Sequence, residues 1–141
     1  MTPSPASTLT HARLHPVDRQ PTGRGAGEWR DLAPDILRQR LVIEGVPARP
    51  IGEAQIKRYL STLSREVDMV DLIEPVTHRS DLYGWAGWIH WETSGAHFYA
   101  WEQPRLFFSV DIYTCKAFDV DTAVSFTRDF FHAGTIVAKP F

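Results

Sequence analysis

Apolar and polar residues follow periodic patterns that predict strands and helices in turn. In LRQRLVIEGV, residues 37–46, apolar side chains fall on one side at Leu37, Leu41 and Ile43, which is typical of a strand. VPARPIG, with two prolines and a glycine, predicts a turn. From Glu53 to Val67 apolar residues recur at helical spacing, namely Ile56, Tyr59, Leu60, Leu63 and Val67. We therefore expect a strand, a turn and an amphipathic helix.

Three further segments predict strands. DMVDLIEPVTH, residues 68–78, is expected to form a strand that ends near Pro75, because proline cannot donate to a central ladder. YGWAGWIHWETSGAHFYAW, residues 83–101, predicts two short strands joined at Thr93-Ser94-Gly95. RLFFSVDIYTC, residues 105–115, alternates, with one face made of Leu106, Phe108, Val110 and Ile112.

The end of the chain predicts a second helix and a closing strand. Asp119 or Asp121 can cap this helix, and Gly134 is expected to terminate it. Its apolar stripe consists of Val120, Ala123, Val124, Thr127, Phe130 and Phe131. TIVAKPF is expected to form an edge strand. We write the order as β-α-β-β-β-α-β and predict an α+β fold, a two-layer sandwich with an antiparallel sheet and two helices on one face.

Composition divides the chain into a tail and one domain. Residues 1–30 are rich in Pro, Thr, Ser, Gly and Arg and show no apolar period, so we expect a flexible tail. Residues 31–141 are expected to form the folded domain.

Charge and cysteine content narrow the function classes. The net charge of -2 gives no electrostatic case for nucleic acid or an anionic membrane. No apolar run approaches the ~20 residues that cross a bilayer, and the N-terminus lacks the apolar region of a secretory signal. The single cysteine, Cys115, favours a cytoplasmic location. The histidines lack the spacing of metal ligands, so we expect no metal.

Residues 83–101 concentrate four of the five tryptophans around one serine. Such a cluster is most often part of a core. Here, however, large rings fall on both faces of the strand, which suggests that both faces are covered. His90, Glu92 and Ser94 share strand parity, so a base, a carboxylate and a hydroxyl are expected on one side. Gly95 permits an unusual backbone directly after the serine.

The sequence resembles the bacterial S-adenosylmethionine decarboxylase family. The resemblance is carried by YGWAG, WETSGAHFYAWEQ and VDIYTC, which correspond to the family's glycine-rich strand, its cleavage site with the following segment, and its DxFTC motif. It extends over about residues 37–141. In such enzymes the chain cuts itself before a serine, which becomes a pyruvoyl group whose carbonyl is the electron sink for decarboxylation. The resemblance therefore implies that Ser94 is the pyruvoyl precursor and Cys115 the proton donor.

The chain departs from the family at its self-processing positions. Thr93 replaces the cleavage-site glutamate and Gly95 its histidine. Ala86 replaces the processing serine, and Tyr99 replaces the processing histidine. His97 shares strand parity with Tyr99, and His90 and Glu92 lie near Ser94 along the strand, so one of them could replace the missing base. A backbone- or water-bonded strand histidine is the other interpretation of His97.

The resemblance also implies a nucleoside pocket and a homodimer. Glu102 or Gln103 occupies the position of the family's ribose-binding glutamate, and aromatic rings suit adenine and a sulfonium cation. The candidate substrate-binding residues are Tyr99, Trp101, Glu102, Gln103, Glu92, Ile43 and Glu44. Members of the family usually pair through their sheets.

Two classes of function remain open from the sequence. The first is a pyruvoyl-dependent decarboxylase of S-adenosylmethionine or a related amino acid, an activity that belongs to polyamine biosynthesis. The second is an uncleaved family member that binds S-adenosylmethionine or a nucleoside, as a regulator or with side-chain-only chemistry.

Overall fold

The computed structural model describes residues 30–141, and Ala33–Phe141 form one compact unit. The tail predicted over residues 1–30 lies outside the described residues, apart from Arg30. The elements in chain order are β1 (Gln39–Val46), α1 (Glu53–Glu66), β2 (Val76–Ser80), β3 (Gly84–Trp91), β4 (Ser94–Trp101), β5 (Phe107–Thr114), α2 (Val120–Phe131) and β6 (Thr135–Pro140).

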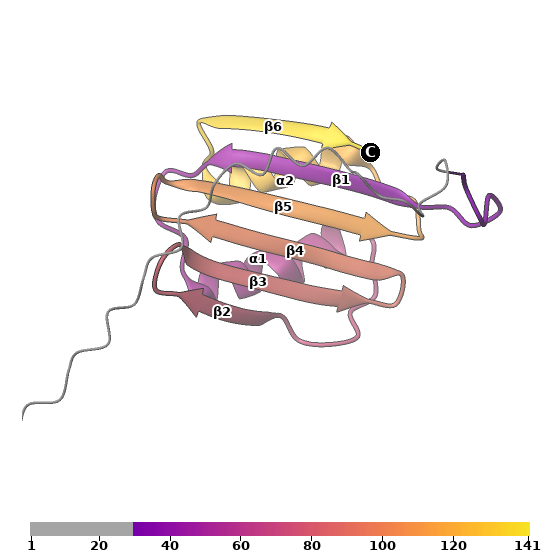
Figure 1. Ribbon diagram of the computed structural model, residues 1–141, viewed down its shortest axis with the longest axis horizontal. Coiled ribbons are helices and arrows are strands. Elements are labelled where there is room, and N and C mark those ends of the chain that lie inside the picture. Colours follow the sequence, from indigo (N-terminus) through magenta and orange to yellow (C-terminus); the bar gives the residue numbers. More distant parts are fainter. Residues whose placement is uncertain (1–29) are drawn as a thin grey trace, which may run out of the picture. The chain divides into compact units, whose positions relative to one another are not determined.

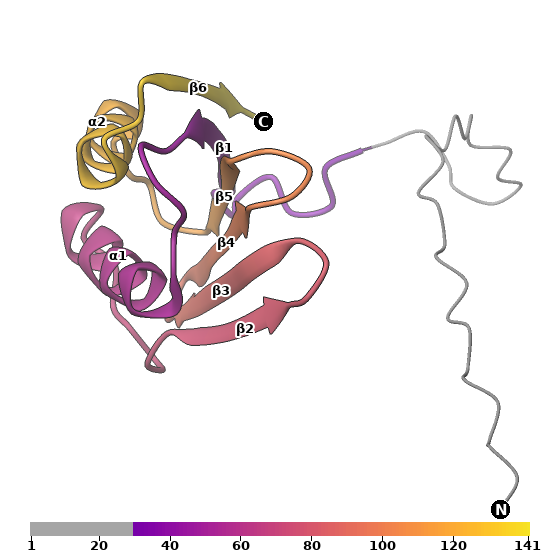
Figure 2. The same cartoon turned by 90° about the vertical axis from the view of Figure 1, so that its left-hand side faces the viewer.

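The strands form one antiparallel sheet in the order β2-β3-β4-β5-β1-β6 (Figure 1). Both helices lie on the same side of this sheet (Figure 2). The predicted two-layer α+β class is therefore confirmed. The described residues contain six strands, the same number as the strand segments predicted one by one, whereas the order β-α-β-β-β-α-β counts only five.

Alternation along each strand places the core between the sheet and the helices. Leu41 and Ile43 of β1, Phe98 of β4 and Ile112 of β5 have no exposed surface. α1 contributes Ile56, Tyr59, Leu60 and Leu63 to this core, and α2 contributes Ala123 and Phe131. The predicted stripes of both helices therefore face the sheet, as their 3.6-residue period requires.

The second strand was predicted too early in the chain. Residues 68–75 form a loop that touches the sheet through one bridge, Asp71 with Trp91, and β2 begins after Pro75. Proline therefore precedes the strand and does not end it.

The end of α2 also differs from prediction. His132, with φ 48° and ψ 45°, is the left-handed C-cap, and Gly134 lies beyond it. At the other end, Asp119 is the N-cap, and its carboxylate accepts from the Thr122 N–H at 2.7 Å. This hydrogen bond lowers the pKa of Asp119.

Within the described residues no helix is long and apolar enough to span a bilayer. Among the same residues, no group of three or more His, Cys, Asp and Glu side chains could hold a metal ion.

Candidate active site on the open face of the sheet

The face of the sheet opposite the helices, called the open face here, is not covered by other elements of the described chain (Figure 2). Its rings are partly exposed: 36% for Trp88, 45% for Tyr99 and 43% for Tyr113. Ring-bearing side chains thus remain on a surface that a single copy leaves open. The expectation of two covered faces is not met within one chain.

Ser94 begins β4 directly after a two-residue turn, Glu92 and Thr93. The sequence placed this turn at Thr93-Ser94-Gly95, whereas in the structure it ends at Thr93, one residue before the serine. Ser94 has φ 140°, a backbone conformation that side-chain-bearing residues rarely adopt. Such strain costs on the order of 1–3 kcal/mol and persists only where the surroundings enforce it.

Hydrogen bonds of Thr93 help to hold Ser94 in this conformation. Its hydroxyl accepts a hydrogen bond from the Thr114 Oγ1 at 2.9 Å and donates to the Met69 Sδ at 3.3 Å. Its carbonyl accepts from the Cys115 N–H at 2.9 Å. The peptide group before Ser94 is therefore fixed on both its side-chain and its carbonyl side.

Gly95 enforces the same geometry from the other side of the serine. A Cβ atom built on Gly95 would lie 2.3 Å from the Ile89 carbonyl oxygen of β3. Only glycine allows the two strands to approach this closely. Gly95 also lines a depression beside the serine.

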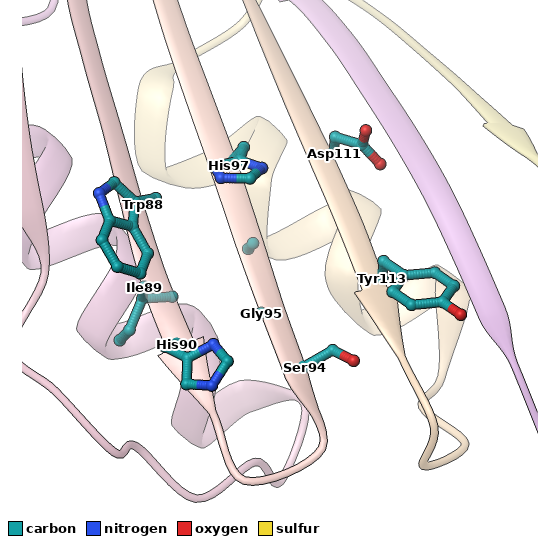
Figure 3. Close-up of a pocket in the computed structure, with 9 residues that line it drawn as sticks. Trp88, Ile89, His90, Ser94, Gly95, His97, Asp111 and Tyr113 are labelled. Carbon is teal, nitrogen blue, oxygen red and sulfur yellow. The ribbon is translucent and has the colours of Figure 1, made fainter.

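This depression is a pocket of about 350 Å³, called the serine-end pocket (Figure 3). Its side-chain lining includes Ser94, Trp88, His90, His97, Asp111 and Tyr113. Asp111 is held by Arg40, whose Nε and Nη2 donate to the two carboxylate oxygens at 2.9 Å and 2.7 Å. This contact raises the pKa of the Arg40 guanidinium and leaves Asp111 paired.

A second pocket of about 350 Å³ lies toward the other end of β3 and β4 and is called the tyrosine-end pocket. Its lining includes Tyr83, Tyr99 and Trp101, and the rings of Tyr83 and Trp101 have centroids 4.9 Å apart. Tyr99 is the cross-strand partner of Ala86. The two positions at which the chain departs from the family's processing serine and histidine are therefore neighbours in this pocket.

The two pockets are far apart within one copy. Ser94 pairs with Thr114, whereas Tyr99 pairs with Ser109, five residues along the same two strands. At 3.4 Å per residue the Cα atoms of Ser94 and Tyr99 are about 17 Å apart. The structure thus separates the serine from the position of the family's processing histidine.

The predicted catalytic residues take different positions around the serine. His97 lies in the serine-end pocket, three residues along β4. Cys115 follows Thr114, the partner of Ser94, and its side chain is exposed. Cys115 does not line the serine-end pocket, so the pocket is not enclosed between the serine and the thiol.

The predicted substrate-binding residues are scattered. Tyr99 and Trp101 share the tyrosine-end pocket. Glu102 and Gln103 follow β4, and their N–H groups donate to the Tyr83 carbonyl at 2.7 Å and 3.4 Å. Glu92 is exposed in the hairpin turn.

The two candidates on β1 differ from one another. Ile43 is fully buried among core residues beneath the helices, so its assignment to a substrate site is wrong. Its neighbour Glu44 lies on the open face, in a separate pocket with Val42 and Lys139. Successive side chains of a strand point to opposite faces, so Ile43 packs in the core while Glu44 lies on the open face.

Two features of the candidate site were missed from the sequence. The hydrogen bonds of Thr93 to Thr114 and Met69 join residues far apart in the chain, and no periodicity indicates them. His78 lines the tyrosine-end pocket as the cross-strand partner of Ala86. Because the second strand was predicted too early in the chain, the pairing of His78 with Ala86 was not predicted.

Comparisons with known proteins show the family and, separately, the fold. Residues 43–141 match the family described as S-adenosylmethionine decarboxylase. No curated protein matches the chain. Among solved structures, the adenosylmethionine decarboxylase from Aquifex aeolicus VF5 is similar, with a TM-score of 0.62 and 16% sequence identity. The match covers 75% of this chain and 89% of that one, and at this identity it shows the fold.

Proposed function

This chain belongs to the S-adenosylmethionine decarboxylase family, and from that premise we propose that it cuts itself between Thr93 and Ser94 and decarboxylates S-adenosylmethionine or a related amino acid. The pyruvoyl group formed from Ser94 would supply the electron sink for this reaction. A cytoplasmic location belongs to the same proposal.

The strained backbone of Ser94, at φ 140°, carries this proposal. Self-cleavage requires the Ser94 hydroxyl to attack the carbonyl carbon of Thr93. Backbone strain in the uncleaved chain lowers the activation barrier of this attack. The Cys115 N–H, 2.9 Å from the Thr93 carbonyl oxygen, can stabilise the negative charge that develops on that oxygen. The local geometry therefore supports cleavage at this peptide bond.

Cys115 and His97 are our candidates for proton transfer during decarboxylation. Cys115 adjoins the cross-strand partner of Ser94, and its exposed thiol can turn toward a substrate bound there. His97 lines the pocket that contains Ser94. The pocket volume of about 350 Å³ accommodates a small amino acid or part of a nucleoside.

The tyrosine-end pocket supports nucleoside binding. Its rings, from Tyr83, Tyr99 and Trp101, suit a planar base, and the face of an aromatic ring attracts a sulfonium cation. Glu102 and Gln103 lie at the end of the same strand, where either could hydrogen-bond ribose hydroxyls.

A homodimer would join the two pockets. Within one copy the serine and the tyrosine end are about 17 Å apart. Two copies that pack their open faces together in opposite directions would place the serine end of each over the tyrosine end of the other. The partly exposed Trp88, Tyr99 and Tyr113 provide apolar surface for this contact.

A second candidate function is favoured by Ala86 and Tyr99. Alanine lacks the hydroxyl, and tyrosine the imidazole, that assist cleavage in the family. An uncleaved chain would keep the aromatic pocket and bind S-adenosylmethionine or a nucleoside, as a regulator or with side-chain-only chemistry.

Release of labelled carbon dioxide from carboxyl-labelled S-adenosylmethionine tests the proposal. We expect the purified chain to release it and the Ser94→Ala variant to release none, while Cys115→Ala retains cleavage but turns over more slowly. No release from the wild-type chain, together with heat on calorimetric titration with S-adenosylmethionine, would support the second candidate. Absence of both carbon dioxide release and binding heat would contradict both functions.

A further inference from the structure

Three open-face residues lie in one row across β2, β3 and β4. His78 is the cross-strand partner of Ala86, and Ala86 is the partner of Tyr99. All three line the tyrosine-end pocket. A histidine therefore lies in the same row as the family's processing positions, one strand further out.

The small side chain of Ala86 leaves space between His78 and Tyr99. Strands two apart are separated by about 10 Å, and the imidazole and phenol can extend toward one another above the alanine methyl group. The His78 side chain is exposed and makes no hydrogen bond or ion pair with other residues of the described chain. Its ring nitrogens are therefore available to a reacting group.

The histidines nearer to Ser94 are less well placed. Figure 3 shows the Ser94 hydroxyl directed toward β5, whereas His90 lies on β3 on the opposite side. The Cα atom of His97 is about 10 Å further along β4. Neither ring faces the serine hydroxyl in one copy, so the base for cleavage is better sought in a second copy.

We propose that His78 of one copy transfers the proton during cleavage of the Thr93–Ser94 bond in a second copy, with the Tyr99 hydroxyl positioning its ring. This proposal rests on the proposed function and on the dimer with opposed open faces. It assigns to β2 the proton transfer for which the family uses the position of Tyr99.

The step balances without any other reactant. The Ser94 Oγ bonds to the Thr93 carbonyl carbon while its proton passes to the His78 ring of the second copy. The bond from that carbon to the Ser94 nitrogen then breaks, and the same proton passes to the nitrogen. The products of this step are an ester on the Ser94 oxygen and a free amine, which still join the two parts of the chain. The parts separate when the Ser94 Cα loses a proton and the Cβ–O bond breaks, which frees the Thr93 carboxylate and leaves a dehydroalanine. Water then hydrolyses this group to the pyruvoyl group and ammonia. General base catalysis of this kind contributes about 10²–10⁴ in rate.

Complementation between two inactive variants tests the proposal. His78→Gln and Ser94→Ala chains, with different tags, are expressed separately and together, and cleavage is followed by mass spectrometry. Alone, we expect His78→Gln to be cut at least about 100-fold more slowly than wild type, and Ser94→Ala not to be cut. Together, the His78→Gln chain should be cut at a near wild-type rate in mixed dimers, because the Ser94→Ala chain supplies His78.

Two further variants make every outcome decisive. His132→Asn, at the exposed C-cap of α2 and away from the open face, is the control and should be cut normally. Adding Ala86→Ser and Tyr99→His to His78→Gln should restore cleavage, which shows that the variant folds and pairs. Normal cleavage of His78→Gln, or no cleavage in the mixed sample, overturns the proposal while the proposed function stands. A wild-type chain that stays whole overturns both.

Discussion

At the scale of single residues, Thr93, Ser94 and Gly95 act together at the hairpin. Thr93 fixes the peptide group through its hydroxyl and carbonyl, Ser94 takes the strained conformation, and Gly95 allows β3 to approach. Two of these residues differ from the family pattern, and both substitutions have a visible physical reason. The threonine supplies a hydroxyl for Thr114 and Met69, and the glycine avoids the Ile89 carbonyl.

Gly95→Ala should destabilise the fold. The new methyl group would lie 2.3 Å from a backbone oxygen, so the hairpin must shift, and overpacking of this kind costs about 1–3 kcal/mol. Urea unfolding measures the change. Gly134→Ala is the matched control, because nothing lies within 4 Å of the added atom. Equal stability of the two variants would contradict the close approach of β3 and β4.

Residue-level chemistry was only partly predictable from sequence. Ser94 and His97, which were predicted as catalytic residues, line the same pocket. Ile43 was misassigned although the alternation of its strand already placed it on the apolar side with Leu41, where both are buried. The place of His78 in the tyrosine-end pocket was missed because it depends on pairing with Ala86, on another strand.

At the scale of elements, periodicity located both helices, and packing then joined them. The Tyr59 hydroxyl of α1 donates to the Thr127 Oγ1 of α2 at 2.8 Å, and Thr127 in turn donates to the Ala123 carbonyl at 2.7 Å. Burial raises the pKa of Tyr59, which therefore stays protonated. The position of β2 was not predictable in the same way, because the apolar residues of its preceding loop imitate a strand.

The hydrogen bond between the helices should respond asymmetrically to mutation. Tyr59→Phe removes one net hydrogen bond, for about 1 kcal/mol, and leaves Thr127 bonded to Ala123. Thr127→Val leaves the buried tyrosine hydroxyl without an acceptor, which costs about 1–3 kcal/mol. Chemical denaturation of both variants, with exposed Ser125→Ala as the control, measures the difference. A smaller loss for Thr127→Val than for Tyr59→Phe would contradict this assignment.

At the scale of the whole molecule, the sheet order interleaves the two fragments that cleavage would produce. Met1–Thr93 contains β1, β2 and β3, whereas Ser94–Phe141 contains β4, β5 and β6. β1 lies between β5 and β6, and β3 lies beside β4, so three ladders join the fragments. A cut chain should therefore stay assembled. The strand order and the distance between the two pockets arise from long-range pairing, which the sequence patterns did not reveal.

Mass spectrometry of the purified chain, under native and then denaturing conditions, tests whether the chain cuts itself before Ser94. Self-cleavage predicts one assembly under native conditions that separates on denaturation into Met1–Thr93 and a fragment that runs from the pyruvoyl group at position 94 to Phe141. It also predicts that Ser94→Ala remains a single chain. A wild-type chain that stays at its full-length mass for days under both conditions would contradict self-cleavage at the strained serine.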